Sequence, residues 1–346
     1  MRLCTIPGDG IGTEVIAAAL EVLRSILPTI EVVEAAAGWG TFQATGVALP
    51  AETLAAARGA DAVLFGAVGS PSHPVPGYRS PIVALRRELD LYANIRPTVA
   101  LPIPLGGYAA TPCDLVVVRE NTEDLYAGRE RWEEADRVAI AERVISRYAS
   151  ERIVRSAFNL ARQRVEAHTR QAKVTIVHKA NVLRLTDGLF RTTALEVAQD
   201  FPDIGVEELL VDTAAMHLAR TPERFDVIVT TNMFGDILSD IACIHGGGLG
   251  LASSANIGPQ HALFEPVHGA APDIAGRGIA NPLATVGCLA MLMAQRTAVI
   301  PNGAHYATQL RGAIAHILRY GPHTPDLGGT ATTQQVTAAV IHYVNQ

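Results

Sequence analysis

Residues Asp226 to Asp240 read DVIVTTNMFGDILSD and join an apolar run to a helical pattern. The run predicts a buried strand, and the residues after it predict a helix that begins near Gly235. Asp236 and Asp240 are four residues apart, so on such a helix they share one face beside the strand end. Their oxygens suit a hard cation such as Mg²⁺ or Mn²⁺. The stretch therefore indicates a strand and helix of an α/β fold with a metal site at the junction.

A simpler interpretation of the pair is also open. Asp236 could be an ordinary acid in the first turn of a helix, and Asp240 a solvated residue on its face. However, Asp212, in LLVDTAAMHLA, lies at a second junction between an apolar strand and a helical pattern. Three acids at such junctions predict a cluster at the carboxyl edge of a parallel sheet, which favours the metal site.

Composition restricts the class of protein. The chain has 346 residues, of which 49% are hydrophobic and 18% charged, as in a globular protein large enough for two lobes. A net charge of -6 and a pI near 6.0 argue against a nucleic-acid partner.

Cysteine spacing and apolar runs bear on the compartment. The four cysteines lack C-x-x-C or Cys/His zinc spacing, so we expect buried thiols in a reducing compartment. The chain begins without a leader-like pattern and has no unbroken apolar run of about 18 residues, which predicts a cytoplasmic protein outside the membrane.

Strand-like and helical segments alternate along the chain, which predicts an α/β protein with a largely parallel sheet. The expected strands are residues 3–7, 61–68, 114–118, 174–178 and 226–231, and the expected late helices are residues 282–295, 305–319 and 332–345. Residues 127–139 are polar and look like an excursion from the main body. The late helices should return to cover the first sheet, so the lobes are discontinuous in sequence.

The first turn, IPGDGIGTE, only partly matches a dinucleotide-binding pattern. Its glycines are Gly8, Gly10 and Gly12, and Thr13 occupies the third position of G-x-G-x-x-G. We therefore expect a tight strand-to-helix turn, able to hold a ligand near its backbone, in a fold that is not a Rossmann fold.

Six motifs occur in a fixed order: IPGDGIG, RENTEDLY, HKANVL, NMFGDILSD, EPVHGAAPDIAGRGIANP and TPDLGG. With them the chain resembles the β-decarboxylating dehydrogenases, the isocitrate/isopropylmalate dehydrogenase family, over residues 3–345. The resemblance implies a large lobe of residues 1–97 and 247–346, with the mostly parallel sheet, the cofactor loop and both termini. It implies a smaller lobe of residues 98–246, with the dimer interface and the metal-binding acids.

The resemblance also implies a homodimer or higher homo-oligomer with shared active sites. Asp236 and Asp240 would bind Mg²⁺ or Mn²⁺ from one chain, while Asp212 reaches in from the other. By the same resemblance Lys179 is the base that takes the hydroxyl proton, and Tyr126 protonates the enolate left by decarboxylation. The catalytic residues are then Tyr126, Lys179 and Asp212.

Substrate contacts follow from the same resemblance. Planar Arg forks suit a substrate with several carboxylates. The implied contacts are Ser80, Arg86, Arg96, Arg119, Tyr126, Lys179 and Asn181. Arg87 should point outward, Tyr92 should pack, and His178 should be a structural neighbour of Lys179.

Cofactor contacts match the first turn and the EPVHGAAPDIAGRGIANP loop. The implied residues are Ile11, Glu265, His268, Gly269, Asp273, Ile274 and Asn281. Gly269 would allow close approach to a phosphate, and Glu265 would lie on the nicotinamide side. Asp273 can accept hydrogen bonds from a ribose 2′-hydroxyl but repels a 2′-phosphate, so the expected cofactor is NAD rather than NADP.

The segment VPGYRSPIVALRRELDLYANIRP should select the hydroxy acid. It keeps Ser80 of the isocitrate pattern but has Ile82 where that pattern has Asn, and it is most similar to homoisocitrate dehydrogenases. Some bacterial homoisocitrate enzymes have Arg where Val83 stands, which leaves Tyr78 and Arg79 as candidates for the distal carboxylate.

The expected reaction is NAD- and metal-dependent oxidative decarboxylation of a (2R,3S)-2-hydroxy-tricarboxylic acid. Homoisocitrate, converted to 2-oxoadipate in lysine biosynthesis, is the first choice. Isocitrate is the first alternative, followed by 3-isopropylmalate or tartrate. A catalytically silent regulatory subunit is the alternative from another class, and retention of the catalytic side chains argues against it.

Overall fold

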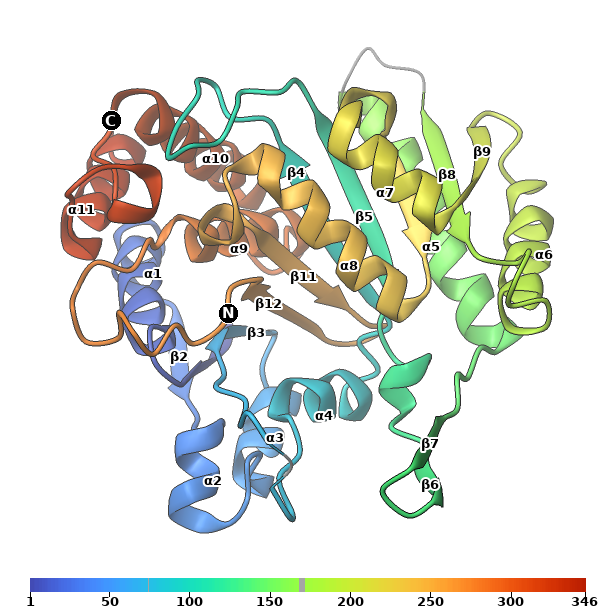
Figure 1. Cartoon of the computed structure of the whole chain (residues 1–346). Coiled ribbons are helices and arrows are strands. Elements are labelled where there is room, and N and C mark those ends of the chain that lie inside the picture. Colours follow the sequence, from blue (N-terminus) through green and yellow to red (C-terminus); the bar gives the residue numbers. More distant parts are fainter. Residues whose placement is uncertain (74, 168–171) are drawn as a thin grey trace. The chain divides into compact units, whose positions relative to one another are not determined.

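The computed structural model describes residues 1–73, 75–167 and 172–346, and the chain divides into two compact units. Unit 1 comprises Met1–Leu91, Ala100–Thr111 and Cys243–Gln346, and unit 2 comprises Tyr92–Val99 and Pro112–Ala242. Both termini belong to unit 1 (Figure 1). These ranges differ from the expected lobes at three places: residues 92–97 group with unit 2, and residues 100–111 and 243–246 group with unit 1. The first difference arises because residues 93–99 form a strand paired along its length with residues 114–120.

Unit 1 contains five strands and seven α-helices within the described residues. The strands are β1 (Arg2–Gly8), β2 (Glu31–Glu34), β3 (Ala62–Ala67), β11 (Ser253–Ile257) and β12 (Ala262–Pro266). The helices are α1 (Gly12–Ile26), α2 (Trp39–Thr45), α3 (Ala51–Arg58), α4 (Pro81–Glu88), α9 (Leu283–Gln295), α10 (Gly303–Tyr320) and α11 (Thr333–Val344). Short 3₁₀ helices occupy Ile244–Gly246 (η3), Leu249–Leu251 (η4) and Pro325–Leu327 (η5).

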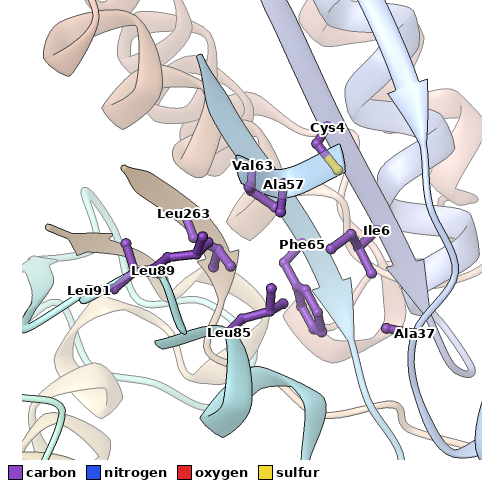
Figure 2. Packing of buried hydrophobic residues seen from close by; sticks show 10 residues of the cluster. All are labelled: Cys4, Ile6, Ala37, Ala57, Val63, Phe65, Leu85, Leu89, Leu91 and Leu263. Atoms are coloured by element: carbon purple, nitrogen blue, oxygen red, sulfur yellow. The ribbon is translucent and has the colours of Figure 1, made fainter. Parts of the chain in front are cut away.

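The strands of unit 1 follow the order β2-β1-β3-β12-β11, and all neighbours except β11 and β12 run parallel. Helices α1 and α9 pack on these strands, and α10 and α11 pack on those two helices. Of the three late helices expected to cover the first sheet, α9 packs on its strands, whereas α10 and α11 form a second layer on α9 and α1. Around β1 and β3, ten buried residues from Cys4 to Leu263 form one apolar core, with Phe65 at its centre (Figure 2). The strand β12, far away in sequence, lies beside β3, so unit 1 does not follow the Rossmann strand order.

The first turn of unit 1 needs glycine for steric reasons. Gly8 and Gly10 have φ of 76° and 56°, a region that favours glycine. A Cβ at Gly10 would lie 2.0 Å from the carbonyl oxygen of Ala270, and the Ile11 amide donates to that same oxygen at 2.9 Å. The turn is therefore tight, as the sequence predicted. It also lies in direct contact with the 265–282 loop.

Unit 2 contains seven strands and four α-helices in its described part. The strands are β4 (Ala93–Val99), β5 (Asp114–Glu120), β6 (Glu130–Glu134), β7 (Val138–Ala141), β8 (Lys173–His178), β9 (Gly205–Leu210) and β10 (Val227–Thr230). The helices are α5 (Arg147–Ala167), α6 (Thr186–Ala198), α7 (Val211–Arg220) and α8 (Asn232–Cys243), with 3₁₀ helices at Leu125–Ala127 (η1) and Pro222–Arg224 (η2).

The main strands of unit 2 follow the order β4-β5-β10-β8-β9, and β5, β10, β8 and β9 are parallel. Helix α5 packs on β5, β8 and β10. The predicted excursion is a separate hairpin, β6 and β7, whose residues are almost all exposed. Because the four parallel strands end at one edge, the segments that follow β8, β9 and β10 meet there with the end of β5.

Helix α8 begins at Asn232, three residues before the predicted start near Gly235. The Gly235 amide already donates to the Thr231 carbonyl at 2.9 Å, and the Met233 amide donates to Asp124 Oδ2 at 3.0 Å. The extra turn exists because a distant carboxylate satisfies its amide, which no local pattern reveals. Asp236 therefore lies in the second turn rather than at the N-terminus of the helix.

Two further expectations concern cysteines and membranes. All four cysteines, Cys4, Cys113, Cys243 and Cys288, are buried free thiols, as predicted. Of the helices in residues 1–73, 75–167 and 172–346, none is both long enough and apolar enough to cross a membrane.

Candidate active site

The carboxyl edge of the unit 2 strands carries most of the predicted catalytic residues. Arg119 is in β5, Lys179 directly follows β8, Asp212 begins α7 after β9, and Asp236 follows β10 on α8. Neighbouring strands lie about 4.8 Å apart, so β8 separates the segment after β10 from the segment after β9. The edge therefore presents two groups of side chains, one around Asp236 and one around Asp212.

The first group converges on the Asp236 carboxylate. Tyr126 donates its hydroxyl hydrogen to Asp236 Oδ2 at 2.5 Å, and Arg119 donates to Oδ1. Arg96 Nη1 lies 3.2 Å from the same Oδ1 and 3.6 Å from Asp240 Oδ1. The Arg119 guanidinium also lies 5.0 Å from the centre of the Tyr126 ring. Five predicted residues from β4, β5, η1 and α8 thus meet within one unit.

Both arginines are fixed by neutral polar residues that the sequence did not single out. Arg119, 1% exposed, donates through Nε and Nη2 to Asn232 Oδ1 at 2.9 and 2.7 Å. Arg96 donates to Asn94 Oδ1 at 2.7 Å and to Ser239 Oγ at 2.8 Å. Asn232 and Ser239 belong to the NMFGDILSD motif. Their place beside Asp236 and Asp240 in that motif is the sequence signal that could have identified them as site residues.

The donor set suits a divalent cation, and this group supplies two of the three predicted carboxylates, Asp236 and Asp240. The Asp236 and Asp240 side chains are 36% and 57% exposed, so both carboxylates can be reached from solvent. The two buried arginines offset their charge, and a dication would leave an excess of two positive charges, which suits a polycarboxylate substrate. Hard cations commonly use only one or two protein carboxylates with substrate and water oxygens.

The second group is an exposed ion pair between Lys179 Nζ and Asp212 Oδ1. Among residues 1–73, 75–167 and 172–346, no three His, Cys, Asp or Glu side chains lie close enough to share a metal. The interpretation of Asp212, Asp236 and Asp240 as a cluster within one chain is therefore wrong, because β8 lies between the strands that carry them. Lys179 goes with Asp212 rather than with Asp236.

His178 and Tyr92, which the sequence assigned to structural roles, make packing and hydrogen-bond contacts. His178 is buried and its Nδ1 accepts from the Ala180 amide at 3.2 Å. Burial lowers its pKa, while Glu208, 3.4 Å from Nε2, opposes this shift. Tyr92 packs its ring on Arg152, whose guanidinium lies 4.5 Å from the ring centre. Asn181 is exposed in the turn after Lys179.

In unit 1, Arg86 is part of a buried chain of polar groups. Arg86 Nη2 donates to Glu265 Oε1 at 2.7 Å, and Asn256 Nδ2 donates to the same oxygen at 2.9 Å. The Arg86 and Glu265 side chains are about nine-tenths buried, and Arg86 Nε is a buried donor with no hydrogen-bond partner within the described residues. Glu265, placed by the sequence on the nicotinamide side, is thus the counter-ion of Arg86. Arg87 points outward, as predicted.

Four of the predicted cofactor residues line one cavity of about 390 Å³ in unit 1. The lining residues are Ile11, Gly250, His268, Ile274, Ile279, Asn281, Pro325 and Asp326. Asn281 Nδ2 donates to Asp326 Oδ2 at 2.9 Å, so the TPDLGG motif meets the cofactor loop here. Asp326 was not among the predicted cofactor residues, although it belongs to the TPDLGG motif.

The cavity has the polarity that a nucleoside needs. His268 Nε2 is buried without a hydrogen-bond partner in the described part of the chain, while Nδ1 lies 3.1 Å from the Gly269 carbonyl oxygen. Burial lowers the pKa of His268, so a neutral ring can donate through Nδ1 and accept through Nε2. Asp273 is exposed beside Ile274, and a Cβ at Gly269 would meet no atom within 4 Å, which leaves open space there.

Known proteins place the chain in a family. The sequence model of the isocitrate/isopropylmalate dehydrogenase family matches residues 2–340. An isocitrate/homoisocitrate dehydrogenase of Thermus thermophilus is 51% identical over 341 residues, which cover 98% of this chain and 97% of the relative. A homoisocitrate dehydrogenase of Methanocaldococcus jannaschii is 47% identical over 355 residues, which cover 100% and 98%. The crystal structure of isocitrate dehydrogenase from Methylococcus capsulatus matches with a TM-score of 0.92 and 40% identity, over 100% of this chain and 99% of that one. The chain therefore belongs to the isocitrate/isopropylmalate dehydrogenase family of hydroxy-acid oxidative decarboxylating dehydrogenases.

Proposed function

We propose that the protein is an NAD- and divalent-metal-dependent dehydrogenase that oxidises and decarboxylates a 2-hydroxy-tricarboxylic acid, with homoisocitrate as its preferred substrate. The observation that carries the proposal is the convergence of Arg96, Arg119 and Tyr126 on Asp236. This group combines cations for substrate carboxylates, an acid for proton donation and exposed oxygens for a metal.

Each side chain has a step that its chemistry suits. Arg96 and Arg119 bind and orient carboxylates of the hydroxy acid. Lys179 takes the proton of the hydroxyl group, and Tyr126 gives a proton to the carbon from which CO₂ has left. When bound, Mg²⁺ or Mn²⁺ at Asp236 and Asp240 supplies Lewis-acid stabilisation of developing negative charge, and NAD accepts the hydride.

A second copy of the chain is the proposed source of the third metal ligand, Asp212. Asp212 and Lys179 form one exposed pair, so both would enter the partner's active site together. Large apolar side chains are exposed on the segments that carry both groups: Val182 and Leu185 in the turn after Lys179, Met216 on α7 and Ile237 on α8. Leu185 is 87% exposed, a costly state for leucine in water. A homodimer that covers these side chains would bring the two groups together.

NAD is the proposed cofactor because of the acids around the cavity in unit 1. Asp326 lines the cavity, and Asp273 is exposed next to the lining residue Ile274. Neither offers a cation to a 2′-phosphate, whereas both can accept hydrogen bonds from ribose hydroxyls. The unpartnered His268 Nε2 can accept one from the adenine amino group.

The distal carboxylate of homoisocitrate is assigned to Arg79. The other sequence candidate, Tyr78, is already engaged: its hydroxyl donates to the Gly69 carbonyl at 3.0 Å, and its ring packs edge-on against Trp39 and Phe42. Arg79 is exposed, and no hydrogen bond or ion pair engages it within the described residues. It directly precedes Ser80, which is the N-cap of α4 and makes no capping hydrogen bond through its side chain.

Substrate preference should depend on Arg79. Steady-state NADH production with Mg²⁺ should give a kcat/KM for homoisocitrate at least about tenfold above that for isocitrate, 3-isopropylmalate or tartrate, or about 1.4 kcal/mol of discrimination. Arg79→Ser should remove most of this preference, because a hydrogen bond to a charged group is lost. Arg87→Ser, an outward residue of α4, is the control with the same change of charge. An unchanged preference in Arg79→Ser would contradict the assignment, and no turnover with any of the four acids would contradict the proposed chemistry and favour a silent subunit.

Tyr126 should act as an acid over the whole neutral range. Burial, with a further contribution from the neighbouring Asp236, raises the pKa of Tyr126 above its ordinary value of about 10. The proton is therefore lost only as pH rises through this raised value. Tyr126→Phe should lower kcat about a hundredfold, and the ratio of the two kcat values should stay constant between about pH 6 and 9. A ratio that falls with pH in this range would show that another group donates the proton.

A further inference from the structure

One buried cation in unit 2 has no part in the steps described above. Arg143 follows the β6–β7 hairpin, and only 10% of its side chain is exposed. Its Nε donates to Asp124 Oδ1 at 2.5 Å, its Nη1 donates to Asp187 Oδ1, and its Nη2 donates to Thr231 Oγ1 at 2.6 Å. The guanidinium also lies 4.6 Å from the centre of the Phe234 ring. We call Arg143, Asp124, Asp187 and Thr231 the Arg143 cluster.

The two carboxylates of the Arg143 cluster carry the contacts onward. Asp124 Oδ1 accepts from the Leu125 amide at 2.9 Å, and its Oδ2 accepts from the Met233 amide at 3.0 Å. Asp187 Oδ2 accepts from the Lys179 amide at 2.5 Å. Both aspartate side chains are fully buried, so no water can replace these bonds without opening the structure.

We propose that Arg143 is a positioning residue that holds together the three segments that bear Tyr126, Lys179 and the two α8 aspartates. The inference rests on the proposed function, because that function gives these side chains their roles. Leu125 precedes Tyr126, the Lys179 amide belongs to the base itself, and Met233 lies in the first turn of the helix that presents Asp236 and Asp240. A displacement of about 1 Å at such groups can cost about a hundredfold in rate.

Arginine is needed at this position for geometric reasons. Its planar fork offers five N–H donors at fixed angles, and the structure uses Nε, Nη1 and Nη2 toward three different segments. A lysine would keep the charge but could reach only part of this set. Burial raises the pKa of Asp187 while Arg143 opposes the rise, so the charged form of this carboxyl depends on the guanidinium.

The chain offers a closely matched control in Arg164. Arg164 is also buried in unit 2 between two aspartates, with Nε donating to Asp226 Oδ1 at 2.8 Å and Nη2 to Asp114 Oδ1 at 3.0 Å. Asp226 in turn accepts from the Lys173 amide at 3.2 Å. These residues lie at the amino ends of β5, β8 and β10, the edge opposite to the catalytic one. The two arginines therefore have similar contacts but different positions.

The test compares Arg143→Lys with Arg164→Lys in the full-length protein. Both should lower the melting temperature, but only Arg143→Lys should lower kcat, by ten- to a hundredfold, with the KM for NAD unchanged within about twofold. Hydrogen exchange should accelerate at the Leu125, Lys179 and Met233 amides in Arg143→Lys and remain slow there in Arg164→Lys. Equal kcat losses in the two variants, or protected amides in Arg143→Lys, would overturn the proposal.

Asp187→Asn covers the case in which Arg143→Lys does not fold. It removes one buried charge and leaves one oxygen where Arg143 Nη1 and the Lys179 amide now use two, while the bonds between Arg143 and Asp124 stay in place. Exchange should accelerate at Lys179 but not at Leu125 or Met233, and faster exchange at all three amides alike would contradict the assigned contacts. If the wild-type protein turned over none of the hydroxy acids, the proposed function would fail, and the exchange pattern alone would decide whether Arg143 holds the three segments.

Discussion

Mixing the inactive variants Lys179→Met and Asp236→Asn should restore about a quarter of the wild-type activity. Each variant alone should lose at least about a thousandfold in kcat, because one lacks the base and the other a metal ligand. Lys179 pairs with Asp212, apart from the Asp236 group, so the proposed dimer draws the base and the α8 aspartates of each site from different chains. After subunit exchange at equal amounts, about half of the dimers are mixed, and each has one intact site of two. The measurement is NADH production before and after exchange.

A second mixture provides the control. Lys179→Met mixed with Asp212→Asn should stay inactive, because both lost groups come from the same chain and every mixed dimer has two defective sites. Lys179→Met leaves a partner, Asp212, whose side chain is 64% exposed, and Asp212→Asn keeps an oxygen that can accept from Lys179, so folding should be preserved. Recovery in the control mixture, or none in the first mixture, would contradict the shared active site.

The protein should prefer NAD over NADP by several hundredfold in kcat/KM. The 2′-phosphate adds about 1.5 to 2 negative charges, and contact between like charges costs several kcal/mol. Asp326 in the cavity accepts a hydrogen bond from the neutral Asn281 amide, and Asp273 beside the cavity is exposed. Within the residues that the structure describes, neither acid is paired there with a cation that would offset its negative charge. Asp273→Lys should reduce the preference to less than about tenfold, mainly through better use of NADP, as measured by initial rates with each cofactor.

Glu52→Lys is the control for this prediction. Glu52 is an exposed acid in the first turn of α3, so its substitution makes the same change in net charge away from the cavity. The cofactor ratio of this variant should match that of the wild type. A similar shift in both variants would mean that overall charge, rather than Asp273, determines the preference.

Sequence reasoning succeeded where short-range patterns determine the structure. The apolar run before Asn232 and the helical spacing after it correctly predict β10 and α8, and the strand ends place Arg119 and Asp236 at one edge. The family motifs added Arg96 and Tyr126, which the structure brings to the same carboxylate. The metal, cofactor and dimer assignments stay predictions.

The remaining features depend on contacts between residues far apart in sequence. Arg86 and Glu265 are 179 residues apart, so they were predicted to have two separate roles although they form one buried ion pair. Asp326 joins the cavity through Asn281, and Arg143 joins segments that no periodicity connects. Such contacts follow from tertiary packing and not from local preference.

The first turn of α8 has a consequence for the order of folding. Its Met233 amide is satisfied by Asp124, 109 residues earlier in the chain, rather than by a neighbouring N-cap side chain. Contacts across such long separations carry a large loop-closure cost and form slowly. The end of the helix that positions Asp236 should therefore become ordered late, when β5 and β10 are already paired. A nascent chain released before residue 232 would contain the Asp124 carboxylate but not the Met233 amide that it caps.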